Sequence, residues 1–369
     1  MMADRIRMDA YAEALRRSVR PGGVVVDLGA GAGIMSCIAA QLGAAKVYAI
    51  EPSDALQVGR AIARANHLED RIQFFPACGK AVTLPERADV LVADLRGVLP
   101  ALGGHFSAIA DARERFLKSD GILIPKRDTV WAALVTAPDA YEELVGGWVY
   151  GSLDLSAGRR MAANSWKKRR VTPAQLLTSP AQWTEIDYGA VNATALAGQL
   201  EAEVHSASVA HGLSLWFDTV LFEDTGFSNA PSEPEAIYGQ AFFPLLEPVP
   251  VESGDRVQIA IRADLAGEDY TWGWNTRIQS PGGLLKADYR QSTFFSSPLP
   301  IEIVRKSGDS FVPSPTEDAA IDRTILDSFG SGRTLREISI DLASRFPGRF
   351  PDWKAAQGRV ASLSVRYAG

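Results

Sequence analysis

The segment from Val24 to Glu51 constrains the fold more than any other part of this 369-residue chain. It opens with three valines, which predict a buried strand, and glycines follow at Gly29, Gly31 and Gly33. Glycine lets the backbone turn with positive φ and lets a ligand approach where a Cβ would collide. A helical run comes next, and the N–H groups of its first turn would face whatever lies on the glycine turn. A second apolar strand then ends in Glu51, whose carboxylate can accept two hydrogen bonds from a ribose diol. The segment therefore predicts a nucleoside-binding unit.

The glycine spacing indicates which nucleoside ligand the unit binds. A dinucleotide site would have its third glycine three residues after the second, whereas here the spacing is Gly-x-Gly-x-Gly, with Asp27 just before it. This arrangement resembles the first motif of class I S-adenosylmethionine (SAM) methyltransferases, with Glu51 in the ribose position. The resemblance implies SAM as cofactor and S-adenosylhomocysteine as product. An ordinary strand, turn and helix with incidental glycines is the alternative.

Composition and charge limit the classes of partner. The net charge of −6 argues against general affinity for nucleic acid. Cys37 and Cys78 lie in apolar surroundings, which predicts buried thiols rather than a disulfide or a metal pair, and the four histidines show no metal-ligand spacing. The start of the chain lacks an apolar signal core, and no apolar run approaches membrane-spanning length. We therefore expect a cytoplasmic protein without metal, membrane or nucleic-acid partners.

Residues 1–135 alternate between strands and helices. That alternation predicts an α/β Rossmann-like domain with a parallel sheet. Ligands of such sheets bind beyond the carboxyl ends of the strands, where Gly29, Glu51 and Asp94 all fall. We expect Asp54 to cap the second of three further helices. The expected helices are 4–19, 54–66 and 106–117, and the expected strands after the first two are 72–76, 88–93 and, following a turn at Asp120, the segment up to 125.

The pattern changes near residue 136. Short alternating strands with Gly and Pro turns, clearest at 213–222 and 255–261, predict an antiparallel β-barrel domain over 136–307. The segment of about residues 137–170 is predicted to form an inserted arm. A Pro-rich linker at 312–315 then introduces a small helical module over 308–369, with helices at 317–329, from a capping box at Thr334 to 345, and from Asp352 to 365.

The order of SAM domain, inserted arm and barrel resembles the protein arginine methyltransferase family over roughly residues 1–300. The segment Met1-x-x-Asp4-x-x-Arg7-x-x-x-Tyr11 matches a family motif, which implies that Arg7 holds the cofactor's methionine carboxylate. The glycines and Glu51 match its cofactor motifs. Cys78 and Gly79 fall where the family contacts adenine, although Lys80 replaces the usual acid. Segments 148–154, 211–218 and 251–257 resemble its dimerisation arm and barrel, which implies a homodimer.

The expected catalytic loop departs from the family pattern. The family grips the target guanidinium with two glutamates in and after Ser-Glu-Trp-Met-Gly-Tyr, because a planar cation needs paired carboxylates. Here Asp94 replaces the first glutamate, Gly103 falls on the second, and Arg96 would repel a cationic substrate. The family's Thr-His-Trp element corresponds to residues 236–238, Ala-Ile-Tyr. The loop therefore predicts an acceptor other than arginine.

Four further features have alternative interpretations. Asp94 could orient or deprotonate a nucleophile, or only cap the following turn. His105 could act as a general base, or be a surface histidine. Arg96 could bind a substrate carboxylate or phosphate, or form a surface ion pair. The basic run 167–170 is more typical of a solvated arm than of a binding site.

The C-terminal segment 325–338 resembles the small helical wing of PqqD-type modules, which recognise leader peptides of ribosomally made natural products. A generic helical packing domain is the alternative. The sequence as a whole predicts a SAM-dependent methyltransferase with an arginine-methyltransferase-like scaffold. Its acceptor would be a peptide or protein side chain or a small molecule other than a typical arginine substrate. The alternative is a catalytically silent SAM-fold scaffold or peptide-binding protein.

Overall fold

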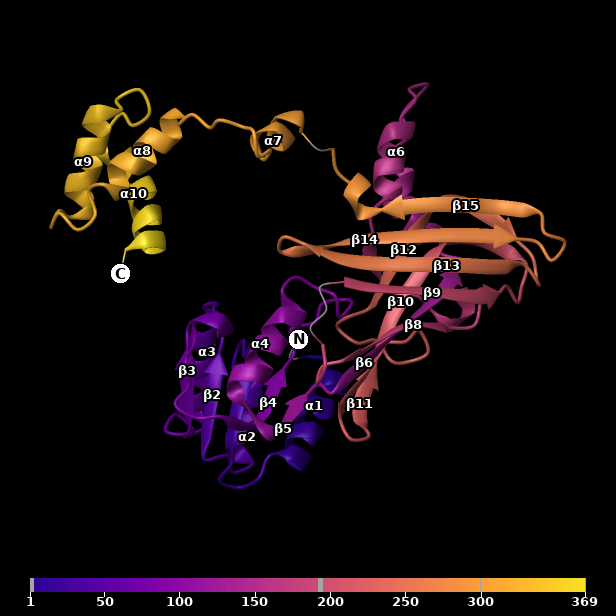
Figure 1. The fold of residues 1–369 in the computed structure, drawn as a ribbon, viewed down its shortest axis with the longest axis horizontal. Helices are drawn as coiled ribbons and strands as arrows, with labels where there is room; N and C mark the ends of the chain where they lie inside the picture. Colours follow the sequence, from indigo (N-terminus) through magenta and orange to yellow (C-terminus); the bar gives the residue numbers. More distant parts are fainter. Residues whose placement is uncertain (1–2, 192–194, 299, 369) are drawn as a thin grey trace. The chain divides into compact units, whose positions relative to one another are not determined.

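The computed structural model describes residues 3–191, 195–298 and 300–368, so Met1 of the N-terminal motif lies outside the described residues. The chain divides into two compact units, Met1–Ser297 and Pro298–Gly369 (Figure 1). The second unit therefore begins at Pro298 rather than at residue 308. The first unit contains both the parallel sheet and the antiparallel sheets.

A five-stranded parallel sheet forms the first half of this unit, with the order β3-β2-β1-β4-β5. Its central strand β1 (Val24–Leu28) is buried along its whole length and pairs with β2 (Lys46–Ile50) and β4 (Ala88–Ala93). The outer strands are β3 (Ile72–Phe75) and β5 (Leu117–Ile124). The strand order reverses next to β1, which creates the crevice where α/β sheets bind ligands. The predicted Rossmann-like architecture is confirmed.

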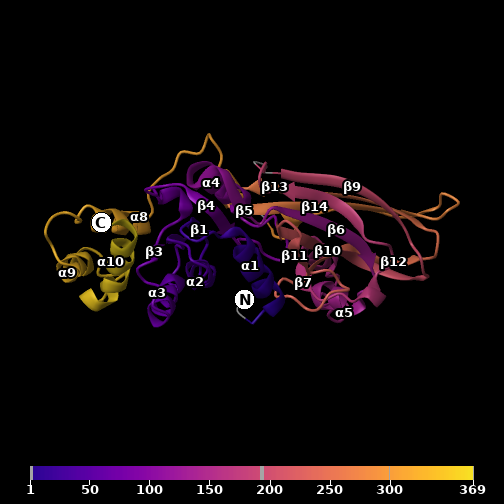
Figure 2. The same ribbon diagram turned by 90° about the horizontal axis from the view of Figure 1, so that it is seen from below.

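Helices cover both faces of this sheet. Figure 2 shows α2 (Ile34–Gln41) and α3 (Ala55–Ala65) on one face and α4 (His105–Phe116) on the other. The first helix, α1 (Arg5–Ser18), is capped by Asp4, whose carboxylate accepts a hydrogen bond from the Arg7 amide at 3.1 Å.

Two local predictions in this half are wrong. Asp54 precedes α3, but its side chain makes no cap hydrogen bond. No turn intervenes at Asp120, because the chain passes directly from α4 into β5 at Leu117.

Two antiparallel sheets form the second half of the first unit, and they enclose one apolar core without closing into a single barrel. Alternate residues of β13 and β14 are buried, as the period-two pattern predicts, whereas β10 is buried continuously over residues 212–217. The six-stranded sheet contains β6 (Arg127–Val135), β7 (Lys167–Arg169), β8 (Ala181–Asp187), β10 (Ser208–Phe222), β11 (Thr225–Ser228) and β12 (Gln240–Val251). The four-stranded sheet contains β9 (Ala195–Glu203), β13 (Arg256–Ala266), β14 (Asp269–Gln279) and β15 (Leu285–Ser292).

The two halves of the first unit share one continuous hydrophobic core. Helix α1 contributes to it through Tyr11, whose ring lies 6.4 Å from that of Phe227 on β11. At the far end of the same helix, Arg17 forms ion pairs with Glu223 and Asp224 in the β10–β11 turn. The parallel sheet and the antiparallel sheets are therefore packed as one body.

The inserted arm consists of α5 (Pro138–Tyr141), a π-helical turn η2 (Glu142–Gly146) and α6 (Ser156–Ala163), and it leads into β7. A separate small core around Tyr141 and Val145 holds it to β12. The basic run at 167–170 is largely a strand, because residues 167–169 pair with β12. Large apolar side chains remain exposed near the tip of the arm, at Trp148, Val149, Tyr150 and Leu153.

The C-terminal unit is a small helical module with its own core, as predicted. Its helices are α7 (Ile301–Lys306), α8 (Glu317–Leu326), α9 (Leu335–Arg345) and α10 (Trp353–Tyr367). The capping box at Thr334 and the Asp352 cap are both present, whereas α7 was not predicted. Across the described residues of both units, no helix is long and apolar enough to cross a membrane.

Candidate cofactor and acceptor site

The glycine turn has the backbone conformation that its sequence predicts. Gly29, Gly31 and Gly33 have φ values of 73°, 53° and 69°, in the left-handed region that disfavours other residues. A Cβ on Gly29 would collide with the side chain of Leu95, whereas a Cβ on Gly31 would meet no atom within 4 Å. The turn is therefore packed on one side and open at Gly31.

Glu51 stands at the end of β2, across from this turn. Its Oε2 accepts a hydrogen bond from the Gly31 amide at 2.9 Å, and its Oε1 accepts one from the Ser53 amide at 2.9 Å. These two bonds fix the orientation of the carboxylate. Each oxygen keeps a further lone pair, so a vicinal diol can still be bound.

Asp27, near the carboxyl end of β1, is buried. Its Oδ2 accepts hydrogen bonds from the Ser36 amide at 2.9 Å and from the Ser36 hydroxyl at 2.6 Å. Burial raises the pKa of Asp27 to about 6, and the bonds from Ser36 counteract part of that effect. An ammonium group placed beside this carboxylate would favour its ionised form.

A cavity of about 360 Å³ joins these groups. That volume lies within the range of small-ligand sites. Six of the predicted site residues line it together, namely Arg7, Asp27, Gly29, Gly31, Glu51 and Asp94.

The remaining predicted site residues, Gly33, Cys78, Gly79 and His105, are not among the described residues that line this cavity. Gly33 directly precedes the lining residue Ile34. Cys37 is buried as predicted, but Cys78 is exposed, because it lies in the loop after β3 rather than in the core.

Asp94 directly follows β4 and lies at the centre of the side where a methyl acceptor is expected to bind, which we call the acceptor side. Its Oδ2 forms an ion pair with Nε of Arg7, and its Oδ1 lies 3.3 Å from both Nε and Nη2 of Arg96. The hydroxyl of Tyr238 is 2.8 Å from each carboxylate oxygen. Burial alone would raise the pKa of Asp94, but the two guanidinium groups and the Tyr238 hydroxyl bring it below its usual range. Asp94 is therefore ionised and already surrounded by donors.

Arg96 is buried rather than exposed, which excludes the alternative of a surface ion pair. Its Nη1 donates to Asp128 Oδ1 at 2.8 Å and to Thr219 Oγ1 at 2.7 Å, and its Nη2 donates to the Tyr11 hydroxyl. The other oxygen of Asp128 accepts from the Tyr188 hydroxyl at 2.7 Å. We call Arg7, Asp94, Arg96, Asp128 and Tyr238 the arginine–aspartate cluster.

His105 is also buried, which excludes the alternative of a surface histidine. Its Nδ1 lies 2.8 Å from the carbonyl oxygen of Pro100, and its ring lies against those of Phe106 and Tyr188. Burial lowers the pKa of His105 to about 4, so the imidazole is neutral near pH 7. Its predicted role as general base stays a prediction.

Two members of the cluster were not predicted as site residues. Tyr238 occupies the third position of the segment that corresponds to Thr-His-Trp, so the alignment itself could have indicated it. Asp128 could have been noticed as an acid in the otherwise apolar alternation of β6, where it is fully buried.

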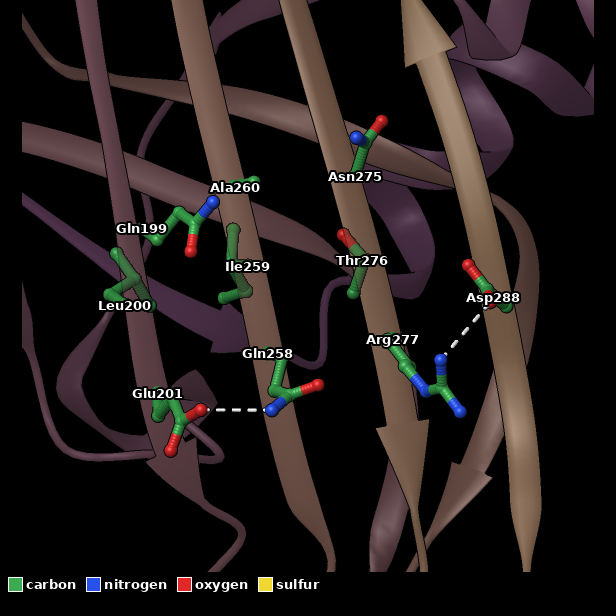
Figure 3. Close-up of a pocket in the computed structure, with 10 residues that line it drawn as sticks. All are labelled: Gln199, Leu200, Glu201, Gln258, Ile259, Ala260, Asn275, Thr276, Arg277 and Asp288. Carbon is green, nitrogen blue, oxygen red and sulfur yellow. Dashed lines mark hydrogen bonds and ion pairs between the residues drawn. The ribbon is translucent and has the colours of Figure 1, made fainter.

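A second hollow lies on the face of the four-stranded sheet that is turned away from the core (Figure 3). Its side chains are mostly polar and partly paired. Gln258 donates to Glu201 at 2.8 Å, and Arg277 lies 3.8 Å from Asp288. None of the residues that line it belongs to the glycine turn or to the arginine–aspartate cluster.

Comparison with known families agrees with this architecture. Residues 11–145 match the model of the ribosomal protein L11 methyltransferases, and residues 126–271 match that of the arginine methyltransferase oligomerization subdomain. Together with the glycine turn, Asp27 and Glu51, these matches identify a class I SAM-dependent methyltransferase, with SAM as its cofactor. Within that class, the chain is protein arginine methyltransferase-like.

Relatives agree with this assignment, and solved structures share the fold. The chain is 25% identical over 339 residues to protein arginine N-methyltransferase PRMT10 of Arabidopsis thaliana. This alignment covers 80% of this chain and 87% of that protein. It is 29% identical over 244 residues to the probable protein arginine N-methyltransferase 6 of the same plant, of which it spans 55%. The solved structure of Arabidopsis PRMT10 aligns with a TM-score of 0.70 at 23% identity, over 79% of this chain and 95% of that chain. A Trypanosoma brucei PRMT1 enzyme–prozyme complex aligns with a TM-score of 0.72 at 22% identity over the same shares.

The residues that line the cavity suit SAM. Gly31 leaves space for a ligand, Glu51 faces that space as a diol acceptor, and Asp27 offers a carboxylate for an amine. Arg7 lines the same cavity, so its guanidinium can hold a carboxylate there. These individual roles stay predictions.

Proposed function

We propose that this protein transfers the methyl group of SAM to a nucleophile that reaches the acceptor site uncharged, on a peptide, a protein side chain or a small molecule, rather than to an arginine guanidinium. The state of Asp94 carries the proposal. This carboxylate contacts two of the protein's own guanidinium groups and the Tyr238 hydroxyl.

The charges of the arginine–aspartate cluster support an uncharged acceptor. Arg7 and Arg96 are balanced by Asp94 and Asp128 before any acceptor arrives. A guanidinium acceptor would have to compete with Arg96 for Asp94 and would add a third positive charge to a buried site. Burying an uncompensated charge costs several kcal/mol. A neutral nucleophile avoids that cost.

The chain's contribution to transfer would be positioning. SAM supplies an activated methyl group on its sulfonium, so the acceptor needs little acid–base help. Because its pKa is lowered, Asp94 is a weak base. We therefore expect Asp94 to orient the nucleophile by accepting a hydrogen bond, while the proton leaves to water.

A transfer assay tests this proposal. The full chain is incubated with SAM labelled in its methyl group and with matched peptides that carry arginine, citrulline, glutamine, histidine or lysine at one position, and products are identified by mass spectrometry. We expect no methylarginine above the level without enzyme. Repeated turnover on the arginine peptide by the unmodified protein would overturn the proposal.

A variant of Asp94 tests its role with any acceptor that is found. Asp94→Asn keeps a hydrogen-bond acceptor for Tyr238 but removes the charge, so transfer should fall while SAM affinity stays within about threefold. Asp54→Asn is the matched control, because Asp54 is exposed and makes no cap hydrogen bond. Unchanged turnover in Asp94→Asn would remove Asp94 from the mechanism. If the unmodified protein does not bind SAM, the scaffold alternative is favoured instead.

Arginine methylation is the second candidate, because the relatives are protein arginine N-methyltransferases by name. It would require Arg96 to leave Asp94 when the acceptor binds. The same assay decides between the two candidates, since methylarginine forms only under the second.

We further propose that the protein forms a homodimer through the inserted arm. The match to an oligomerization subdomain and the exposed cluster of Trp148, Val149, Tyr150 and Leu153 support this. Sedimentation analysis of the double variant Val149→Asp, Tyr150→Asp should show monomer where the unmodified chain shows dimer. A monomer in both cases would refute the assignment of the arm.

A further inference from the structure

An aromatic cavity lies on the other face of the six-stranded sheet, away from the core side chains Leu215 and Phe217. Its volume is about 320 Å³. Trp131 on β6 and Trp216 on β10 are direct cross-strand partners, and Asp218 follows on the same face of β10. Prolines and small side chains complete the lining, namely Pro173, Leu176, Pro180, Ala230, Pro231 and Ser232.

The carboxylate in this cavity has no cationic partner. Asp218 Oδ2 accepts a hydrogen bond from Nε1 of Trp131 at 2.7 Å, which fixes both side chains. Among the described residues, Asp218 forms no ion pair, and no hydrogen bond reaches its Oδ1. In the loop that supplies Ala230, Pro231 and Ser232 to the lining, the carbonyl oxygen of Glu233 accepts a hydrogen bond from Arg170 at 2.7 Å. Asp218 therefore presents a carboxylate at the Nε1 edge of the Trp131 indole, on the same face of the sheet as Trp216.

From this geometry we infer that the cavity binds an organic cation, an ammonium or guanidinium group, either as a small molecule or as a Lys or Arg side chain of a polypeptide. The electron-rich faces of the indoles attract such a cation. The carboxylate adds a charge-assisted hydrogen bond, and the proline walls accept the apolar part of the ligand. An anion would be repelled, and a neutral apolar ligand would leave the carboxylate desolvated with the Trp131 indole as its one hydrogen-bond donor among the described residues.

This site is independent of the proposed methyl transfer. No residue that lines the aromatic cavity also lines the cofactor cavity or belongs to the arginine–aspartate cluster. Binding of the cation is therefore expected with or without SAM, and a failure of either proposal leaves the other intact.

The experiment is calorimetric titration of the full chain, without SAM, with N-acetyl-arginine amide, N-acetyl-lysine amide and tetramethylammonium. N-acetyl-citrulline amide serves as the neutral probe. At least one cation should bind saturably, and citrulline at least about tenfold more weakly, the scale of one charge-assisted hydrogen bond. Stronger binding of the amino-acid amides than of tetramethylammonium would indicate a polypeptide source, and the reverse order a small molecule.

Two variants and one control make the test specific. Asp218→Asn keeps a hydrogen-bond acceptor for Trp131 Nε1 and should lower the affinity for the cation at least about tenfold. Trp131→Phe keeps the carboxylate but replaces one indole by a ring that attracts cations less strongly. It should therefore lower the affinity for the cation by a smaller factor. Glu233→Gln, in the adjacent loop, should leave affinity unchanged. Any of three results would overturn the inference. The Asp218→Asn variant could bind the cation as tightly as the unmodified chain, citrulline could bind as tightly as the cations, or no cation could give a saturable heat signal.

Discussion

The cofactor cavity and the arginine–aspartate cluster lie next to each other, yet their carboxylates are satisfied in opposite ways. In the cofactor cavity, Asp27 and Glu51 accept hydrogen bonds from backbone amides and from one hydroxyl, and among the described residues neither forms an ion pair. In the cluster, Asp94 and Asp128 both contact the Arg96 guanidinium.

This difference teaches where a ligand's charge is needed. A carboxylate held only by uncharged donors keeps its negative charge available, so a bound amine or diol can pair with it. A carboxylate already paired with the protein's own cation needs no charge from a ligand, and an uncharged donor is the ligand group that suits it. The first arrangement favours binding, and the second favours a stable, neutral acceptor site.

The largest expected effect comes from breaking the cluster at Asp128. Asp128→Ala would leave the buried Arg96 without its strongest partner, so the free energy of unfolding should fall by about 3–5 kcal/mol. Chemical denaturation measures this. Glu185→Ala removes the partner of Arg127 in an exposed pair of 3.6 Å and should cost less than about 1 kcal/mol. Equal losses in the two variants would contradict the buried role of Arg96.

On the cofactor side, Glu51→Ala should weaken SAM binding about 10–100-fold, since hydrogen bonds to a charged group contribute roughly 1.5–3 kcal/mol. Stability should change little, because the carboxylate is only partly buried. Calorimetric titration with SAM and S-adenosylhomocysteine measures the loss, with Asp54→Ala as the exposed control. Unchanged affinity would remove Glu51 from the cofactor site.

Titration of Asp27 should make SAM affinity depend on pH. With its pKa at about 6, Asp27 is protonated below that pH and cannot pair with an ammonium. Affinity at pH 5 should therefore be about tenfold lower than at pH 7.5, and Asp27→Asn should remove this dependence. Because burial raises the pKa of Asp27, the folded state binds this proton more tightly than the unfolded state does. The resulting contribution to the free energy of unfolding is present near pH 4 and is lost as the pH rises through about 6. An unaltered pH profile in Asp27→Asn would assign the dependence to another group.

The smaller of the two effects on the stability of the cluster is expected at Tyr238. Tyr238→Phe removes one hydroxyl donor from the ionised Asp94, which still contacts Arg7 and Arg96, so the free energy of unfolding should fall by about 1.5–3 kcal/mol. Thermal or chemical denaturation measures this, and Tyr150→Phe on the exposed arm is the control. A loss as large as that of Asp128→Ala would show that Tyr238, rather than Asp128, holds the cluster together.

The sequence predicts the cofactor side well because its determinants are local. The valine run, the alternating glycines and Glu51 lie within one strand–turn–helix–strand unit, and each has a conformational reason at its own position. The capping box at Thr334 is predictable for the same reason, although the likeness of the C-terminal module to PqqD-type modules stays a prediction.

The acceptor side could not be predicted in this way. Arg96 meets Asp128, Tyr11 and Thr219 across separations of 32, 85 and 123 residues, and no periodicity encodes such pairings. Burial of His105 depends on Phe106 and Tyr188 in the same manner. Side chains that are polar by type but buried by tertiary packing are where sequence patterns fail.

The pairing of Arg96 with Asp128 also limits how this protein can evolve. Replacing Arg96, so that Asp94 could bind a guanidinium, would leave Asp128 buried without a cation. Replacing Asp128 first would leave Arg96 buried without this carboxylate. Either single substitution passes through a destabilised intermediate, so the two positions are strongly epistatic. Under the proposed function, freeing Asp94 for a guanidinium therefore requires a joint change in a loop of the parallel-sheet half and a strand of the antiparallel half.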